Sequence, residues 1–244
     1  MAPLVADAGV EVLGEPDFYA QLLTAPDVGF LVESTLRRLA ATDFAETETE
    51  ITALLELFAT VTDAHASDKV GHSRRVASLA VMVALALGLG SEQQARVRWT
   101  ALIHDVGVIT VPKSLLDQPR LLSRDEVAEV RRQVSRVEEL LAPISGLEDV
   151  IHTAACHAEA FDGSGYPAGL EGTDIPLGAR IITICDTFDA LTSRRPYREA
   201  RDTALAVDIL LRGSGSLFDP DVVAAAVPVF LISQSAEEMQ ATVG

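Results

Sequence analysis

Apolar residues recur at helical spacing along most of the chain after residue 50. Leu54, Leu55, Phe58 and Val61 would lie on one face of a helix. The run from Leu79 to Leu89 is rich in alanine and leucine, which favours a buried helix that ends at its glycines. The alternation of apolar and polar residues that is typical of half-buried strands is not convincing anywhere. The pattern therefore predicts an all-α protein.

Capping residues and helix breakers predict where the helices begin and end. Ser91 with Gln94, and Ser123 with Glu126, have the serine-to-acid or serine-to-amide pattern that we expect of capping boxes. The second box would open a helix that lasts until Pro143. Residues 162–176 are dense in glycine and proline and predict a loop. Further helices are expected at about 147–158, from Pro176 past Asp186, at 202–211 and at 220–231.

The chain divides into three parts of unequal size. Residues 1–50 are mixed and acidic, with two expected helices near 17–23 and 28–41, and their role is not indicated. Residues 51–235 carry the helical pattern and form the main domain, which we expect to be a helical bundle. Residues 236–244 are interpreted as a C-terminal tail.

Composition excludes some partners and leaves others open. The 244 residues carry a net charge of −17 and no long basic run, which argues against a DNA or RNA polymer as partner. The N-terminus lacks a positive region followed by an apolar one, and the longest apolar run is too short for a membrane span. We therefore expect a cytoplasmic protein with no membrane partner. Cys156 and Cys185 are interpreted as small core residues, with a redox role as the alternative.

Four residues in three separate segments have side chains that suit a metal ion. They are His72, then His104 and Asp105, and finally Asp186. Neutral imidazoles and carboxylates together bind divalent cations of borderline hardness, such as iron, manganese or zinc. A cation held in this way lowers the pKa of a bound water and polarises a phosphoryl group. The set therefore favours a metal-dependent phosphohydrolase.

Each of these residues also has a structural interpretation. His104 and Asp105 close a helix before Gly107, where a histidine could satisfy carbonyl groups and an aspartate could face solvent. His72 could be a partly buried histidine on an amphipathic helix. Asp186 is harder to explain without a function, because it follows an apolar stretch and an unpaired buried carboxylate is very costly.

The chain resembles the HD-GYP branch of the HD phosphohydrolase superfamily over roughly residues 51–229. The resemblance is carried by GHSRRV at 71–76, HDVG at 104–107, the segment 112–126, DGSGYP at 162–167, Ile175-Pro176, CDTFDALTSRRPYR at 185–198 and FDPDVV at 218–223. It implies a helical bundle. For many members it also implies hydrolysis of the bacterial second messenger cyclic di-GMP with two or three iron or manganese ions.

The resemblance assigns roles to individual residues. It implies metal ligands at His72, His104, Asp105 and Asp186, with Asp68 and His157 as further candidates. It implies catalytic roles for Asp105, His157 and Arg195, and substrate contacts at Gly165, Tyr166, Pro167, Arg195 and Arg198. Glu159 matches the acid of the family's HHE motif. Asp68 has an alternative role as a helix N-cap.

Three positions depart from the family pattern. Ala158 replaces the second histidine of HHE, Gln133 replaces a histidine seven residues after Glu126, and Val108 replaces a lysine expected to meet a phosphate. Alanine and valine cannot coordinate a metal or carry charge, and glutamine is a weak neutral ligand. The resemblance therefore implies one firmly bound divalent metal. Iron or manganese is expected, with zinc, magnesium or nickel as alternatives.

Two functions stay open on this basis. The first is an enzyme that hydrolyses a cyclic dinucleotide or another phosphate ester at a reduced rate. The second is an inactive nucleotide sensor, or a docking module for a signalling protein such as a GGDEF-type cyclase. A homodimer is a further alternative.

Overall fold

The computed structural model describes residues 47–66, 69–118, 120–193 and 200–243, and for 234–243 it describes the backbone alone. Within these ranges the chain is helical and contains no β-strand. The elements are α4 (Glu48–His65), α5 (His72–Ala86), α6 (Ser91–Ile103), η1 (Val106–Thr110), α7 (Lys113–Leu116), α8 (Arg124–Arg131), α9 (Gln133–Leu141), α10 (Glu148–Ala155), η2 (Gly172–Asp174), α11 (Leu177–Thr192), α12 (Thr203–Arg212) and α13 (Pro220–Val243).

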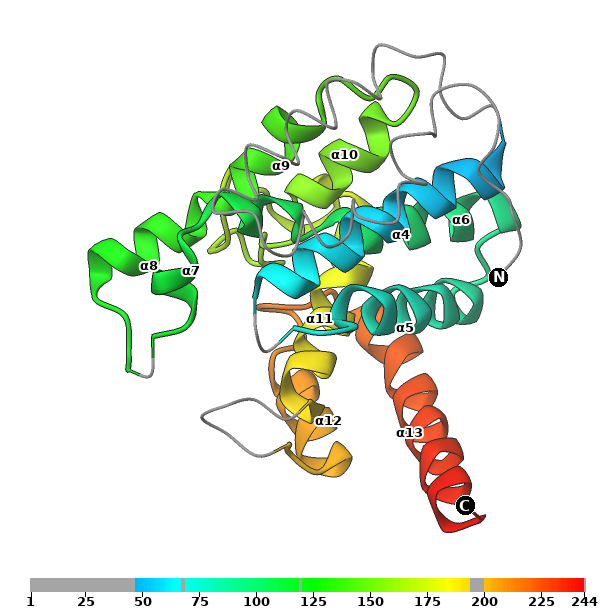
Figure 1. The fold of residues 1–244 in the computed structure, drawn as a ribbon. Coiled ribbons are helices and arrows are strands. Elements are labelled where there is room, and N and C mark those ends of the chain that lie inside the picture. Colours follow the sequence, from blue (N-terminus) through cyan, green and yellow to red (C-terminus); the bar gives the residue numbers. More distant parts are fainter. Residues whose placement is uncertain (1–46, 67–68, 119, 194–199, 244) are drawn as a thin grey trace.

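The helices form a bundle with α11 near its centre (Figure 1). Helix α5 packs along α6, and α11 contacts both of them as well as α10, α12 and α13. Helix α4 covers α6 and η1, while α7 and α8 project from one side of the bundle (Figure 1). This arrangement brings the start of α5, the end of α6 and the middle of α11 together.

Apolar side chains on these helices explain why they pack in this way. Ile181, Ile182 and Ile184 of α11 are fully buried, which matches the apolar stretch seen in the sequence. The rings of Phe188 and Phe230 stack with their centroids 4.1 Å apart and join α11 to α13. A buried side chain of this size contributes about 1.5–3 kcal/mol relative to an exposed one.

The structure confirms one predicted capping box and corrects the other. Ser123 accepts a hydrogen bond from the Glu126 amide at 3.3 Å, and Glu126 accepts one from the Ser123 amide at 2.7 Å. The box predicted at Ser91 is wrong by one residue. Gly90 is the N-cap, and its amide donates to the Gln93 side chain at 3.2 Å, because Ser91 is already helical.

Some predicted bounds differ from the observed ones. The helix expected from Ser123 to Pro143 is interrupted at Arg132, which divides it into α8 and α9. The helix expected at 147–158 ends at Ala155, and α13 continues through most of the stretch interpreted as a tail. The predicted helices near 17–23 and 28–41 lie outside the described residues. Among the described residues, no helix combines the length and the apolar character that a membrane span needs.

Candidate metal and phosphate site

His72 is the first residue of α5, and the fold rather than a local cap fixes this helix end. Gly71 precedes it in a left-handed conformation, with φ of 73°, and no side chain within the turn caps the helix. Asp63 of α4 supplies the missing acceptor, since its carboxylate accepts hydrogen bonds from the Ser73 amide at 3.2 Å and the Ser73 hydroxyl at 2.7 Å. The buried carboxylate of Asp63 therefore positions the turn that carries His72.

His104 and Asp105 lie where α6 ends and η1 begins. The glycine two residues later is required by packing. A Cβ at Gly107 would lie 1.9 Å from the backbone oxygen of Gln133 in α9, which is closer than atoms can approach. The HDVG spacing thus lets α9 come close beneath the site.

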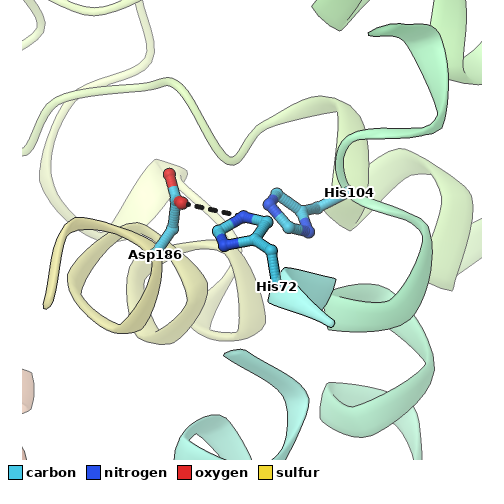
Figure 2. Close-up of side chains that lie close together, drawn as sticks. All are labelled: His72, His104 and Asp186. Carbon is cyan, nitrogen blue, oxygen red and sulfur yellow. Dashed lines mark ion pairs between the residues drawn. The ribbon is translucent and has the colours of Figure 1, made fainter. Parts of the chain in front are cut away.

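Helix α11 carries Asp186, and its apolar face directs this carboxylate towards the two histidines. One ligand atom from each of His72, His104 and Asp186 lies within 4.8 Å of the others, and Figure 2 shows the three side chains pointing towards one another. His72 Nε2 lies 3.2 Å from Asp186 Oδ1 (dashed in Figure 2). Three residues that are distant in the sequence therefore lie close together in the fold.

Acceptors behind each histidine ring fix which of its nitrogens faces the site. His72 Nδ1 lies 2.8 Å from an Asp189 carboxylate oxygen, and His104 Nδ1 lies 2.7 Å from the Ala101 carbonyl. His157 repeats the pattern, with Nδ1 2.8 Å from the Ala154 carbonyl. A proton on each Nδ1 leaves Nε2 as the metal-binding atom, which is the arrangement found around metal-ligating histidines.

The donor set fits a divalent cation. The Nε2 atom of His104 is buried and has no hydrogen-bond partner within the described part of the chain, and the buried Nε2 of His72 has ionic contacts alone, to Asp186 and Asp105. A buried polar atom without a partner costs about 1–3 kcal/mol, and a cation would remove that cost for the Nε2 of His104. Two imidazoles and a carboxylate suit zinc, iron or manganese in particular.

The charges of the site keep the two histidines in different protonation states. Burial alone would lower the pKa of His72, but the carboxylates of Asp186 and Asp189 outweigh it and raise the pKa to about 9. Burial lowers the pKa of His104 to about 4. Burial would raise the pKa of Asp186, but His72 holds it below its usual value. Without a cation, His72 is therefore protonated at neutral pH and His104 is neutral.

Asp105 faces the same point but is held by another group. Its Oδ2 lies 3.6 Å from Nε2 of both His72 and His104, so it contacts two members of the group of three. The same oxygen forms an ion pair with the Lys69 ammonium. Burial would raise the pKa of Asp105, but the charges of Lys69 and the nearby histidines hold it well below its usual range.

The other predicted site residues are placed as follows. The His157 ring lies 5.0 Å from that of His104, edge to face, so it flanks the group. Tyr166 is half-buried, and the Arg131 guanidinium lies 4.9 Å from its ring centroid. Pro167 is exposed and follows a cis peptide bond. The candidates Asp68, Arg195 and Arg198 lie outside the described residues.

Gly165 and Glu159 organise the glycine-rich loop. A Cβ at Gly165 would lie 2.1 Å from the Ala160 amide nitrogen, so only glycine fits this close crossing of the chain. The buried Glu159 carboxylate accepts hydrogen bonds from the amides of Ala168, Gly169 and Leu170 at 2.7, 3.2 and 3.2 Å. The loop that presents Tyr166 is therefore fixed from inside.

Sequence reasoning gave no role to several residues that shape the site. Asp189 orients His72 and is itself held by Arg75, whose Nε and Nη2 lie 2.6 and 3.0 Å from its two oxygens. One signal was present, because Asp189 follows Asp186 by three residues and so shares a face of α11. Lys69 and Asp63 had no comparable signal, since their partners are distant in the sequence or in other elements.

Comparisons with known proteins identify the family of this chain. The family model of the HD domain matches residues 56–222. The chain belongs to the HD domain family. A 3'3'-cGAMP-specific phosphodiesterase 3 of Vibrio cholerae is 35% identical over 70% of this chain and 37% of its own length. The cyclic di-GMP phosphodiesterase response regulator RpfG of Xanthomonas campestris is 40% identical over 62% of this chain and 40% of its own length. This HD domain protein thus spans less than half the length of these two relatives.

Solved structures share the helical fold of this chain. The structure of a cyclic GMP-AMP specific phosphodiesterase of V. cholerae superposes with a TM-score of 0.51 and 27% identity, covering 90% of this chain and 50% of that one. An HDG"Y"P protein from Bdellovibrio bacteriovorus gives a TM-score of 0.53 at 15% identity, covering 86% and 67%. The second likeness shows a shared fold.

The three departures from the HD-GYP pattern are visible in this HD domain. Val108 is buried in η1 and brings no charge to the site. Gln133 is buried, and its Oε1 has no hydrogen-bond partner among the described residues. Ala158 follows His157 in the turn after α10 and has no ligand atom.

Proposed function

We propose that this protein hydrolyses a phosphodiester bond of a cyclic dinucleotide, using one firmly bound divalent cation. The observation that carries the proposal is the buried Nε2 of His104, which has no hydrogen-bond partner among the described residues and lies close to His72 and Asp186. The relatives named as phosphodiesterases of cyclic di-GMP and 3'3'-cGAMP support the substrate class. We infer iron or manganese as the cation, with zinc, magnesium and nickel as alternatives to be tested.

The chain's own residues would divide the work of hydrolysis. The cation would supply Lewis-acid activation of water and of the phosphoryl group. The oxygen of water forms a bond to phosphorus, the bond from phosphorus to the ribose oxygen breaks, and the proton lost by water ends on that ribose oxygen. His157 would move this proton through Nε2, since its Nδ1 is committed to the Ala154 carbonyl.

The remaining predicted residues enter this proposal as contacts to the substrate. Tyr166 lies half-buried in the loop that Glu159 fixes, so its ring is a candidate surface for a base or ribose. Asp105 would complete the cation site from the HDVG turn. Arg195 and Arg198 remain proposed contacts to the phosphates, and Asp68 remains a proposed further ligand.

The proposal of a single cation follows from the missing donors. A second cation beside Asp105 would have His157 as a donor, while Ala158 supplies none and Gln133 only a weak one. In two-metal sites the cations stabilise both the attacking and the leaving oxygen. Loss of one cation therefore weakens the stabilisation of one of these two oxygens. We therefore expect turnover slower than that of a complete two-metal site.

Metal analysis combined with a turnover assay tests the proposal. The purified protein is analysed for bound metals and then incubated with cyclic di-GMP or 3'3'-cGAMP and added Mn²⁺ or Fe²⁺. We expect about one cation per chain and linear or mononucleotide product. The variant His104→Ala removes one buried donor and should abolish both readouts, whereas His152→Ala, an exposed histidine outside the site, should leave them unchanged.

A non-catalytic nucleotide sensor is the second candidate, favoured by the losses at Val108, Gln133 and Ala158. Tight binding of a cyclic dinucleotide with no product after long incubation in Mn²⁺ would support it and would exclude the phosphodiesterase. A docking role for a GGDEF-type protein, and a homodimer, would be tested by size-exclusion chromatography with light scattering.

A further inference from the structure

Lys69 is a basic side chain at the edge of the metal site. It lies in the turn between α4 and α5, three residues before His72, and its carbonyl accepts a hydrogen bond from the His72 amide at 2.9 Å. Its ammonium pairs with Asp105 Oδ2, the same oxygen that lies 3.6 Å from Nε2 of His72 and of His104. The side chain is 20% exposed, so it reaches the site from the solvent edge.

The position of this ammonium relative to the donors matters. Asp105 Oδ2 contacts both the Lys69 ammonium and the two histidines. Only this oxygen therefore separates the ammonium from the point where the cation would bind. A phosphoryl group bound at that point would bring its other oxygens close to the ammonium. Lysine has three donor hydrogens and can bridge a carboxylate and a phosphoryl oxygen.

The residues near Lys69 bring little other positive charge to a phosphate bound at the site. Arg75 already forms two hydrogen bonds to Asp189, which removes its guanidinium from the phosphate side of the site. Val108 places an apolar side chain in η1 directly after the HDVG turn, and Ala158 has no polar atom. On the side of Asp105, Lys69 is therefore a positive group that could meet a phosphodiester in addition to the proposed contacts of Arg195 and Arg198.

We propose that the Lys69 ammonium binds a non-bridging oxygen of the substrate phosphate and takes over the charge that a second cation would bring. The proposal rests on the proposed function for its catalytic part, but its anion-binding part can be tested independently. The opposite interpretation is that Lys69 fills the space of an absent cation and withdraws when a cation binds Asp105.

A pair of lysine variants separates these interpretations. Lys69 and Lys113 are the two lysines of the chain, and Lys113 is half-exposed, donates to the His65 carbonyl and pairs with Asp117. The variants Lys69→Met, Lys69→Arg and the control Lys113→Met are loaded with Mn²⁺. Calorimetry then measures Mn²⁺ binding, followed by the binding of inorganic phosphate to the loaded protein.

The expected result is a loss that is specific to the anion. Lys69→Met should keep about one Mn²⁺ per chain with little change in affinity. It should weaken phosphate binding and slow turnover by roughly tenfold to a hundredfold, which is the scale of a hydrogen bond to a charged group. Lys69→Arg should retain part of the phosphate binding and part of the turnover, and Lys113→Met should match the wild type in both measurements. Tighter Mn²⁺ binding or a second Mn²⁺ in Lys69→Met, with unchanged phosphate binding and turnover, would overturn the proposal.

A footprint on the unmodified chain provides a test that does not depend on the folding of any variant. Acetic anhydride labels the two lysines, and mass spectrometry reports the rate at each. Phosphate added to the Mn²⁺-loaded protein should slow acetylation of Lys69 and leave Lys113 unchanged. If Mn²⁺ alone speeds acetylation of Lys69 and phosphate does not slow it, Lys69 only occupies the position of the cation, and the proposal is wrong. If no cyclic dinucleotide is hydrolysed by the wild type, the proposed function fails, while the footprint still decides the role of Lys69.

Discussion

Metal binding to the chelator-treated protein should release a proton from His72. The carboxylates of Asp186 and Asp189 raise the pKa of His72 to about 9, so its Nε2 is protonated near neutral pH. A metal ion can bind that nitrogen only after the proton leaves. His104 contributes no proton above pH 5, because burial lowers its pKa to about 4. We therefore expect metal binding to release a proton from His72 and none from His104.

The size of the effect follows from the distance between the pKa of His72 and the working pH. At pH 7 roughly 99% of His72 is protonated, because pH 7 is about two units below that pKa. The apparent metal affinity is then about a hundredfold weaker than at high pH, which corresponds to about 3 kcal/mol. Between pH 6.5 and 8 the affinity should rise by about tenfold per pH unit, with about one proton released per cation.

Isothermal titration calorimetry in buffers of different ionisation enthalpy measures this proton directly. Anaerobic titrations with Mn²⁺ at pH 6.5, 7 and 8 give both the affinity and the number of protons released. Asp189→Asn removes one carboxylate beside His72 and should reduce the proton release, whereas Asp174→Asn, an exposed aspartate of η2, should not. An affinity that does not change with pH, together with no released proton, would refute the assigned protonation of His72.

Three further predictions concern the glycine-rich loop and the missing donors. Glu159→Ala leaves three amides without an acceptor and should lower the free energy of unfolding in urea by about 2–4 kcal/mol, with a smaller loss in Glu159→Gln. Gly165→Ala forces a Cβ to 2.1 Å from a backbone nitrogen and should cost about 3 kcal/mol or more of thermal stability. Gly172→Ala, with no atom within 4 Å of the new Cβ, should cost only the strain of its φ, about 1 kcal/mol. The double variant Gln133→His with Ala158→His restores two donors and should raise the manganese content, measured by elemental analysis, from about one to about two ions per chain. An unchanged manganese content would contradict the proposal that these missing donors prevent binding of a second cation.

Helical periodicity predicted most of the described fold because each long helix buries a continuous apolar face. Ile181, Ile182 and Ile184 show this for α11. The predicted helix bounds were less reliable, because neighbouring residues compete for the capping position. At the start of α6, Gly90 and Gln93 form the cap although Ser91 is the better capping residue by type. Propensity ranks residues one at a time, whereas the packing of the preceding turn decides which residue is already helical.

The sequence indicated the candidate ligands of the site but not the residues that contact them. His72, His104 and Asp186 stand out by residue type and motif, and the structure brings them together. Lys69, Asp63 and the role of Asp189 depend on how α4, α5 and α11 pack, which no periodicity reveals. The candidate ligands can therefore be predicted from the sequence, while the groups that set their orientation and charge are found only in the fold.

Retained ligands do not by themselves show that a metal binds, because most of the charges are balanced within the protein. Lys69 pairs with Asp105, Arg75 pairs with Asp189, and a protonated His72 faces Asp186. His104 is different. It is fully buried, its pKa is lowered to about 4, its Nδ1 is bonded to a carbonyl, and its Nε2 has no hydrogen-bond partner among the described residues. A neutral imidazole with a bare buried lone pair is a cost that none of these ion pairs offsets. The Nε2 of His104 is therefore the single atom that argues most strongly for a cation at this site.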